Sequence, residues 1–224
     1  MKILESVITD DGVLSIVSRD NMLALRNGDT GYSCIYTDDT VYQPILIPVQ
    51  ELLERFSLYH EVKAVAVLGG GCCTLPRFII KRFNNTIRID SVEYLSAIID
   101  LTRKYFLCGI ETGKLNLIHD DAFSFIRNIP HRYDFILVDL FVGGDVIKKS
   151  HSIDFLMDVD DHLSDGGIVV FNEYKRTIEE CKDFCKLGAA LFQKSFIMVD
   201  EDNSYYVAFT NGGFDEQEIQ NYLL

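Results

Sequence analysis

The sequence predicts an α/β fold, a Rossmann-like doubly wound sheet with a C-terminal antiparallel hairpin, preceded by a small N-terminal β-unit. Three observations support this prediction. The first part of the chain carries short strand patterns and no segment with helical periodicity. Beyond it, short apolar runs alternate with helix-length segments, which is typical of a parallel sheet covered by helices. Two strand patterns on either side of Asp200–Ser204 predict the terminal hairpin.

The N-terminal β-unit is expected over residues 1–46. Turn signals such as Asn27-Gly28 separate its strands, and Pro44 and Pro48 mark the change to helical spacing. Residues 47–224 are assigned to the Rossmann-like domain. The strands expected in the β-unit are Ile3–Thr9, Val13–Ser18, Met22–Leu25 and Ser33–Tyr36.

The Rossmann-like domain is expected to alternate strands and helices along its whole length. Its parallel strands are Lys63–Leu68, Ile87–Val92, Lys114–Ile118, Asp134–Asp139 and Ile168–Asn172. Its helices are Val49–Phe56, Leu75–Phe83, Leu95–Phe106, Ala122–Asn128, His151–Leu163 and Ile178–Phe192. The hairpin pairs Ser195–Val199 with Tyr205–Thr210. Such sheets bind ligands outside the carboxyl ends of their strands, so the candidate site is expected there.

Composition and charge narrow the class of protein. The formal net charge of −13 argues against a nucleic-acid partner, because binding to phosphates requires a basic face. It also disfavours anionic membrane surfaces, and no apolar run approaches the roughly 20 residues that span a bilayer. The N-terminus lacks the pattern of a signal peptide, so a cytoplasmic protein is expected.

The six cysteines include no CxxC pair and have no histidine at metal-ligand spacing. They are expected to be reduced and mostly buried, and no metal site is expected. They are Cys34, Cys72, Cys73, Cys108, Cys181 and Cys185.

Two candidate binding motifs follow the first two parallel strands. Gly69, Gly70 and Gly71 allow a tight turn and a close approach of a ligand to the backbone. No Gly-Lys-Ser/Thr follows them, which excludes a P-loop nucleoside triphosphatase. Glu93 lies 22 residues after Gly71, near the spacing of about 20 at which an acid binds ribose hydroxyls. The alternative for Glu93 is a solvated acid at a strand end.

Two further candidates follow the third and fourth parallel strands. A carboxylate at Asp121 can accept a hydrogen bond from an adenine amine, while the N–H of Ala122 donates to the ring; the alternative is a helix N-cap. Asp139 ends a buried strand at the expected crevice, where it can hold an amine or act as a general base. Its alternative is a strand-end acid bound to backbone amides. A nucleophilic pair of Cys72 and His119 is the least favoured alternative.

The segments VLGGGCCTLPRF, SVEYL, HDDAFSFI and YDFILVDLF, in this order and spacing, resemble the spermidine synthase-like branch of the class I S-adenosylmethionine-dependent methyltransferase fold. The resemblance covers nearly the whole chain. It implies S-adenosylmethionine, its decarboxylated form or methylthioadenosine as the nucleoside ligand, and an acceptor such as a polyamine. It also implies oligomer contacts, and hence a homodimer, through the N-terminal β-rich segment.

By this resemblance, the Gly69–Gly71 turn lies along the nucleoside, Glu93 binds its ribose, and Asp121 with Ala122 reads its adenine. Asp139 matches the first acid of the family's Asp-x-x-Asp-Pro signature, which handles the substrate amine. Tyr42 and Gln43 match residues that reach over the donor from the N-terminal domain, and this makes them candidate substrate-binding residues.

The sequence also departs from the family pattern. Cys72 and Cys73 stand where the family has Asp-Gly, Val142 takes the place of the second signature acid, and Leu95 replaces a further Asp. Carboxylates would neutralise a cationic donor and a diamine acceptor, so these losses count against aminopropyl transfer. Methyl transfer stays open because a methyl donor mainly needs alignment with its acceptor.

Three hypotheses follow from the sequence. The first is a spermidine synthase-like transferase that uses S-adenosylmethionine or its decarboxylated form, with an unidentified acceptor. The second is a nucleoside-binding protein on the same fold that performs no chemistry. The third, a nicotinamide-dependent oxidoreductase, is disfavoured because the turn at Gly69–Gly71 does not continue as GxGxxG.

Overall fold

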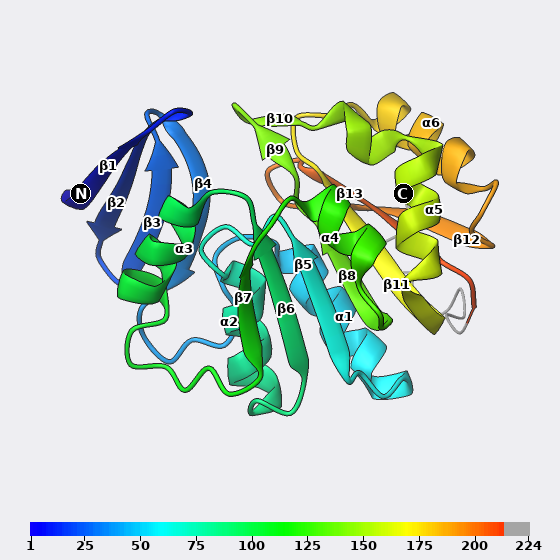
Figure 1. Ribbon diagram of the computed structural model, residues 1–224, viewed down its shortest axis with the longest axis horizontal. Coiled ribbons are helices and arrows are strands. Elements are labelled where there is room, and N and C mark those ends of the chain that lie inside the picture. Colours follow the sequence, from blue (N-terminus) through cyan, green and yellow to red (C-terminus); the bar gives the residue numbers. More distant parts are fainter. Residues whose placement is uncertain (213–224) are drawn as a thin grey trace.

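The structure is a computed structural model that describes residues 1–212. It contains a four-stranded N-terminal sheet, a seven-stranded central sheet and a short two-stranded hairpin. The Rossmann-like α/β class predicted from the sequence is confirmed, with antiparallel strands at both ends of the chain. Figure 1 shows the N-terminal sheet, in blue, beside the central sheet and its helices.

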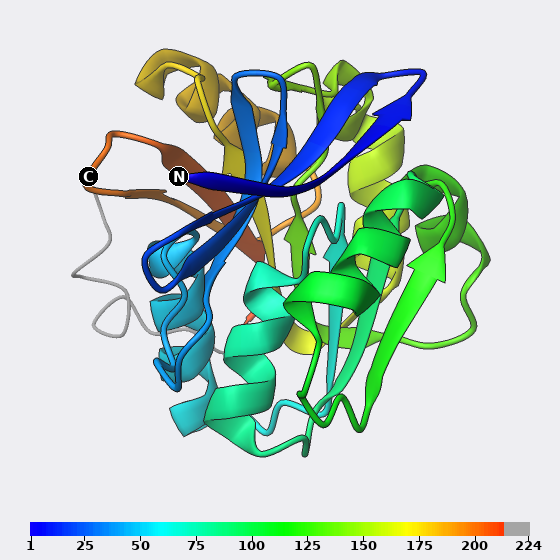
Figure 2. The same ribbon diagram turned by 90° about the vertical axis from the view of Figure 1, so that its left-hand side faces the viewer.

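The N-terminal sheet is an antiparallel meander in the order β1-β2-β3-β4. Its strands are β1 (Lys2–Thr9), β2 (Gly12–Arg19), β3 (Met22–Asn27) and β4 (Thr30–Tyr36). One face of this sheet buries its apolar side chains against residues 95–106. The buried side chains are Leu14, Ile16, Leu25 and Ile35. Figure 2 shows this sheet, in blue, beside the green helical segment 96–106, with which it shares a core.

The central sheet has the strand order β12-β13-β11-β8-β5-β6-β7. The five neighbouring strands β11, β8, β5, β6 and β7 run parallel to one another. Strand β13 runs antiparallel to both of its neighbours, β11 and β12. The strands are β5 (Ala64–Leu68), β6 (Arg88–Glu93), β7 (Leu115–His119), β8 (Tyr133–Val138), β11 (Leu163–Glu173), β12 (Lys194–Val199) and β13 (Tyr205–Thr210). The predicted terminal hairpin is therefore β12 and β13.

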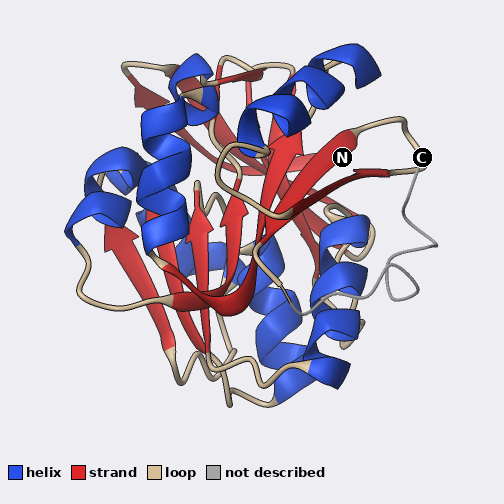
Figure 3. Cartoon of the chain, turned by 90° about the vertical axis from the view of Figure 1, so that its right-hand side faces the viewer, coloured by secondary structure: helices blue, strands red, loops and turns tan. Residues whose placement is uncertain are grey.

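Helices cover both faces of this sheet (Figure 3). On one face α1 and α2 pack, and on the other α4, α5 and α6. The alternation along β5 shows why its sequence is uniformly apolar, since Val65 and Val67 belong to the first core and Ala66 and Leu68 to the second. The helices are α1 (Ile47–Tyr59), α2 (Thr74–Phe83), α3 (Ser96–Leu101), α4 (Ala122–Asn128), α5 (Ile153–Asp161) and α6 (Ile178–Gly188).

Three predicted helices differ from the observed ones. The helix expected over Leu95–Phe106 is α3 followed by a π-helical turn at Thr102–Phe106. The helix expected from His151 begins later, because Ser152 caps α5 by accepting a hydrogen bond from the N–H of Phe155 at 3.2 Å. The helix α6 ends at Gly188, four residues before the predicted end at Phe192.

Within residues 1–212, none of the helices is long and apolar enough to cross a bilayer.

Candidate functional site

The candidate residues lie where the parallel strands end, and backbone hydrogen bonds connect their loops. The N–H groups of Gly69 and Gly70 both donate to the carbonyl of Val92, at 3.0 and 2.8 Å. The N–H of Asp139 donates to the carbonyl of Leu68 at 2.8 Å. The ends of β5, β6 and β8 are therefore held side by side, as expected for a ligand site at the carboxyl edge of such a sheet.

The glycine turn after β5 requires glycine for two separate reasons. Gly69 has φ +87°, and a Cβ at this position would lie 2.1 Å from the carbonyl oxygen of Asp139. A Cβ on Gly70 would lie 2.2 Å from Oγ of Ser91. The turn therefore presses against the loop that carries Asp139, and no larger residue fits there without moving that loop.

We expect Gly69→Ala to lower the free energy of unfolding by about 2–4 kcal/mol, because it adds a backbone clash to a left-handed conformation. The matched control is Gly28→Ala, where φ is +57° and a Cβ would meet no atom within 4 Å. That variant should cost only about 1–2 kcal/mol of backbone strain. Urea unfolding of both proteins measures the difference, and equal losses would mean that the Gly69 contact is relieved by a small shift of the Asp139 loop.

Glu93, at the end of β6, closes the glycine turn with its carboxylate. Its Oε2 accepts a hydrogen bond from the N–H of Gly71, and its Oε1 accepts one from the N–H of Leu95, both at 3.0 Å. Burial raises the pKa of Glu93, while these backbone donors lower it. Each carboxylate oxygen keeps a second lone pair, so Glu93 can still accept hydrogen bonds from a diol.

Asp121 forms the N-cap of α4, so the alternative role weighed for it is present. Its Oδ1 accepts a hydrogen bond from the N–H of Ser124 at 2.9 Å. Its other carboxylate oxygen takes no hydrogen bond from residues 1–212 and can still bind a ligand. Ala122 is buried beside it, and the exposed Asp120 accepts from the N–H of Asp121 at 2.8 Å.

Asp139 follows β8 directly and is half-buried. Burial raises the pKa of Asp139 to about 7, and repulsion from Glu93 acts in the same direction. The side chain of Asn172 opposes this rise, because its Nδ2 donates to Oδ1 of Asp139 at 2.8 Å. A carboxylate that titrates near neutral pH can exchange a proton with a substrate amine.

Asn172 was not identified from the sequence, although it lies near the end of β11, next to β8. Its Oδ1 accepts a hydrogen bond from the N–H of Tyr174 at 3.1 Å, and this contact fixes which end of the amide faces Asp139. The signal that could have found it is its position, since polar residues that end neighbouring parallel strands meet at the same edge.

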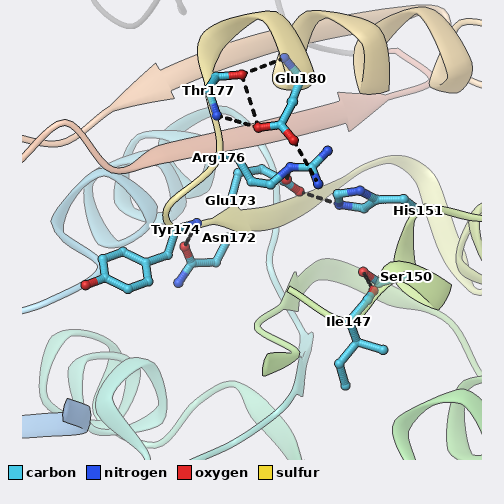
Figure 4. A network of polar contacts seen from close by, with 9 residues as sticks. All are labelled: Ile147, Ser150, His151, Asn172, Glu173, Tyr174, Arg176, Thr177 and Glu180. Carbon is cyan, nitrogen blue, oxygen red and sulfur yellow. Dashed lines mark hydrogen bonds and ion pairs between the residues drawn. The ribbon is translucent and has the colours of Figure 1, made fainter. Parts of the chain in front are cut away.

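A buried polar network holds the end of β11 beside this site (Figure 4). Glu173 is completely buried, and its Oε1 lies 2.9 Å from Nε2 of His151. Arg176 pairs with Oε2 of Glu173 at 3.6 Å and with Glu180 at 3.4 Å. Thr177 and Glu180 form a capping box that begins α6. The network ties the loop before α5 and the start of α6 to the strand that carries Asn172.

Cys72 and His119 do not form a nucleophilic pair. Cys72 is completely buried beneath the N-terminal sheet, and burial raises the pKa of its thiol well above the usual value. Burial also raises the pKa of Cys73, to about 12. His119 is exposed, and its Nε2 lies 2.9 Å from the carbonyl oxygen of Tyr94. Neither thiol is an accessible thiolate.

Tyr42 and Gln43 lie in the connection between β4 and α1. Gln43 is completely buried, and its amide donates to the carbonyls of Thr40 and Val41 at 3.1 and 2.9 Å. The Tyr42 hydroxyl donates to Glu54 on α1. Both side chains hold the connection between the two sheets in place. Their expected role in binding a substrate stays a prediction.

In the part of the chain that the structure describes, no group of three or more His, Cys, Asp or Glu side chains is arranged to hold a metal ion.

A family of known proteins matches most of the chain. The family described as the spermine/spermidine synthase domain matches residues 47–209, which is well over half of the chain. The chain belongs to this family. The resemblance inferred from the four sequence segments is thus confirmed.

Within the spermine/spermidine synthase family, one relative is the polyamine aminopropyltransferase of Lachnospira eligens. It is 26% identical over 133 residues, which cover 58% of this chain and 46% of the relative. The chain thus spans about half the length of this relative, and 55% of that of Agathobacter rectalis.

Two solved structures of the family share the fold. A probable spermidine synthase from Corynebacterium glutamicum has a TM-score of 0.80 at 16% identity and covers 96% of this chain and 81% of its own. Spermidine synthase in complex with the transition state analogue AdoDATO has a TM-score of 0.68 at 14% identity, with coverages of 98% and 78%.

Proposed function

We propose that this spermine/spermidine synthase family member is an aminopropyltransferase, which moves the aminopropyl group of decarboxylated S-adenosylmethionine to an amine acceptor. The observation that carries the proposal is Asp139, a half-buried carboxylate with a pKa of about 7 at the carboxyl edge of the sheet. The polyamine aminopropyltransferase relatives support the choice of aminopropyl over methyl transfer.

The residues at the strand ends fit an adenosyl ligand. The glycines leave the backbone of the turn free of side chains, so a ligand can approach it closely. Glycine is also required by packing, because a Cβ on Gly69 or Gly70 would lie less than 2.5 Å from atoms of the protein. Glu93 retains lone pairs for the two ribose hydroxyls, and Asp121 retains one carboxylate oxygen for the adenine amine. These residues would hold the donor, while a sulfonium donor supplies a carbon already activated for displacement.

Asp139 would act on the acceptor. In aminopropyl transfer the amine lone pair forms the new C–N bond, while the electrons of the C–S bond remain on sulfur and methylthioadenosine leaves. Asp139 takes the proton that the amine gives up, which its raised pKa favours at neutral pH. Asn172 keeps the carboxylate oriented for this transfer through its 2.8 Å hydrogen bond.

The experiment that tests this proposal has two steps. Calorimetric titration with decarboxylated S-adenosylmethionine, S-adenosylmethionine and methylthioadenosine, with NAD as the control, measures binding. Formation of methylthioadenosine from the decarboxylated donor and a diamine then measures transfer. We expect micromolar binding of the adenosyl sulfur compounds, no binding of NAD, and release of methylthioadenosine that depends on the diamine.

The second candidate is a nucleoside-binding protein without chemistry. Cys72 favours it, since this residue stands where the family has a carboxylate and is completely buried among apolar side chains. Binding of methylthioadenosine without any transfer from either sulfonium donor would support this second function and exclude the first.

A further inference from the structure

Two consecutive residues at the end of β11 point to opposite faces of the sheet. Asn172 faces the candidate site, where its Nδ2 donates to Oδ1 of Asp139 at 2.8 Å. Successive side chains of a strand alternate between its faces, so Glu173 points the other way, and it is completely buried there. The contacts of Glu173 therefore bear directly on the position of Asn172.

The partner of Glu173 is the imidazole of His151. Its Nε2 lies 2.9 Å from Oε1 of Glu173, and Figure 4 shows the two side chains facing each other. The imidazole is also stacked on the ring of Phe184 on α6, with centroids 4.1 Å apart and planes at 26°. His151 ends the short 3₁₀ turn at Lys148–His151, in the segment that joins Asp139 to α5. The pair thus connects the end of β11 to the chain that follows Asp139.

The segment between Asp139 and His151 is itself closed by hydrogen bonds. The N–H of Ile147 donates to the carbonyl of Leu140 at 3.0 Å. The N–H and the hydroxyl of Ser150 both donate to the carbonyl of Ile147, at 2.9 and 2.7 Å. These contacts lead from Leu140, next to Asp139, to Ser150, next to His151.

Together these contacts form a closed ring that contains the candidate base. From Asp139 the ring runs through residues 140–150 to His151, across to Glu173, and back through Asn172. Two side-chain contacts close it, that of Asn172 with Asp139 at 2.8 Å and that of His151 with Glu173 at 2.9 Å. Groups within one such network are energetically coupled, so loss of one contact should weaken the other.

Stability alone does not account for this buried pair. A carboxylate taken out of water costs free energy unless donors satisfy its lone pairs. Oε2 of Glu173 and Nε of Arg176 are buried, lie 3.6 Å apart and form no hydrogen bond in the part of the chain that the structure describes. Further titratable groups near the pair come from α6, namely Glu180, Cys181 and Cys185. Since apolar residues would fill this place at lower cost, the geometry that the pair imposes explains it better.

We propose that His151 and Glu173 are positioning residues of the candidate base, because their contact holds Asn172 in place to bind and orient Asp139. This inference rests on the proposed aminopropyl transfer, in which Asp139 accepts the proton of the amine. Neither His151 nor Glu173 touches the substrate in this role, and both act through Asn172.

The direction of the change at Asp139 separates positioning from simple electrostatics. The hydrogen bond from Asn172 lowers the pKa of Asp139, so a displaced Asn172 should let this pKa rise. Loss of the Glu173 charge alone would lower the pKa, because a nearby anion raises the pKa of a carboxyl group. Glu93 on β6 and Tyr206 on β13 are the other titratable groups that act on Asp139 or respond to it, and the variants below leave both intact.

The experiment follows the Asp139 carboxyl carbon by NMR through a pH titration of the full chain, with the signal assigned from Asp139→Asn. His151→Phe keeps a ring on Phe184 and removes the contact with Glu173. We expect it to raise the titration midpoint by about 0.5–1 pH unit, the effect of one lost hydrogen bond. The same loss should lower kcat at pH 7 about three- to tenfold and move the pH profile of transfer to higher pH.

Two further variants test whether the effect passes through Asn172. In the Asn172→Ala background, His151→Phe should move the midpoint no further, because the contact through which it acts is already absent. Glu173→Gln removes the charge but keeps a hydrogen-bonding partner for His151, so it should not raise the midpoint. Shifts from His151→Phe and Asn172→Ala that add in full would overturn the inference.

The matched control is His162→Phe, which removes a second histidine at the opposite end of α5. Its ring nitrogens lie 2.8 Å from the carbonyl oxygen of Asp158 and 3.1 Å from that of Ile129. This variant should leave the Asp139 midpoint unchanged, even if urea unfolding shows a loss of stability.

Urea unfolding also establishes that His151→Phe is folded. If it is not, the double variant Glu173→Leu with Arg176→Leu replaces the buried charges by apolar side chains and breaks the same contact, and the same rise is expected. A midpoint that does not rise in the folded variant overturns the inference.

The two measurements separate this inference from the proposed function. If the midpoint rises but no methylthioadenosine is released from the decarboxylated donor and a diamine, the positioning of Asp139 is supported and the proposed function alone is overturned. If transfer occurs and its pH profile is the same in His151→Phe as in the original protein, the inference alone is overturned.

Discussion

Replacing Asp139 by Asn is expected to lower the rate of aminopropyl transfer by about 10²–10⁴-fold, the range by which a positioned general base accelerates a reaction. The amide has nearly the shape of the carboxylate and can still accept the 2.8 Å hydrogen bond from Asn172. It cannot take a proton from the amine. The affinity for methylthioadenosine, measured by calorimetry, should therefore change by less than about threefold.

The pH dependence of transfer gives a second measurement of the same residue. A base must be deprotonated to act, so the rate should rise with pH through about 7, the pKa of Asp139. Asn172→Ala removes the hydrogen bond that lowers this pKa, and the rise should then move to higher pH. If the Asp139→Asn variant loses nucleoside affinity and rate together, or the Asn172→Ala profile does not move, Asp139 is not the base.

The Asp139→Asn variant should also change the stability of the protein in a pH-dependent way. The pKa of Asp139 is raised in the folded protein from 3.8 to about 7, so the folded state holds a proton that the unfolded chain has released. Its contribution to stability therefore falls as pH rises from about 4 to 7 and stays at its lowest value above that. Asp139→Asn should raise the Tm at pH 8 and leave it unchanged at pH 3, as thermal melts at the two values would show.

Glu93→Gln should weaken binding of methylthioadenosine by about 10- to 100-fold, because a charge-assisted hydrogen bond is worth roughly 1.5–3 kcal/mol. Glutamine has the same length but only one acceptor oxygen. Its NH₂ group would face either the N–H of Gly71 or that of Leu95, both of which now donate to the carboxylate at 3.0 Å. The glycine turn would lose part of its support together with the ligand contact.

Calorimetric titration measures this loss, and urea unfolding separates it from a general loss of stability. Asp183→Asn serves as the charge control, because it removes an acid that is exposed and far along the sequence in α6. Nucleoside affinity equal to that of the original protein in Glu93→Gln would remove Glu93 from the binding site. An affinity loss matched by Asp183→Asn would show that net charge, not the Glu93 contact, is responsible.

The sequence predicted the order of the elements because local patterns are strong in a parallel sheet covered on both faces. Within the predicted strands Lys63–Leu68 and Asp134–Asp139, the runs 64–68 and 135–138 are apolar at every position, and they lie in the adjacent strands β5 and β8 near the centre of the sheet. Helix α4 lies at Ala122–Asn128, as predicted, since Asp121 marks its N-cap. Such features depend only on near neighbours in the chain.

Features that depend on distant contacts were predicted less well. The π-helical turn at Thr102–Phe106 interrupts a helix pattern that is continuous in the sequence, and there the Thr102 hydroxyl donates to the carbonyl of Gly71 at 3.2 Å. The hairpin of β9 (Phe141–Val142) and β10 (Asp145–Val146) is too short to produce a strand pattern, although Gly143-Gly144 is a turn signal.

The sequence by itself determined the fold class, the family and the position of Glu93, Asp121 and Asp139 at strand ends, because strand ends and glycine turns are encoded locally. Only the tertiary structure decided which side chains surround these residues. It brought Asn172 to Asp139 across two neighbouring strands, it buried Gln43 among backbone carbonyls, and it set Asp145 opposite Val142. Pairing between segments far apart in the chain depends on register and burial, and no local pattern specifies either.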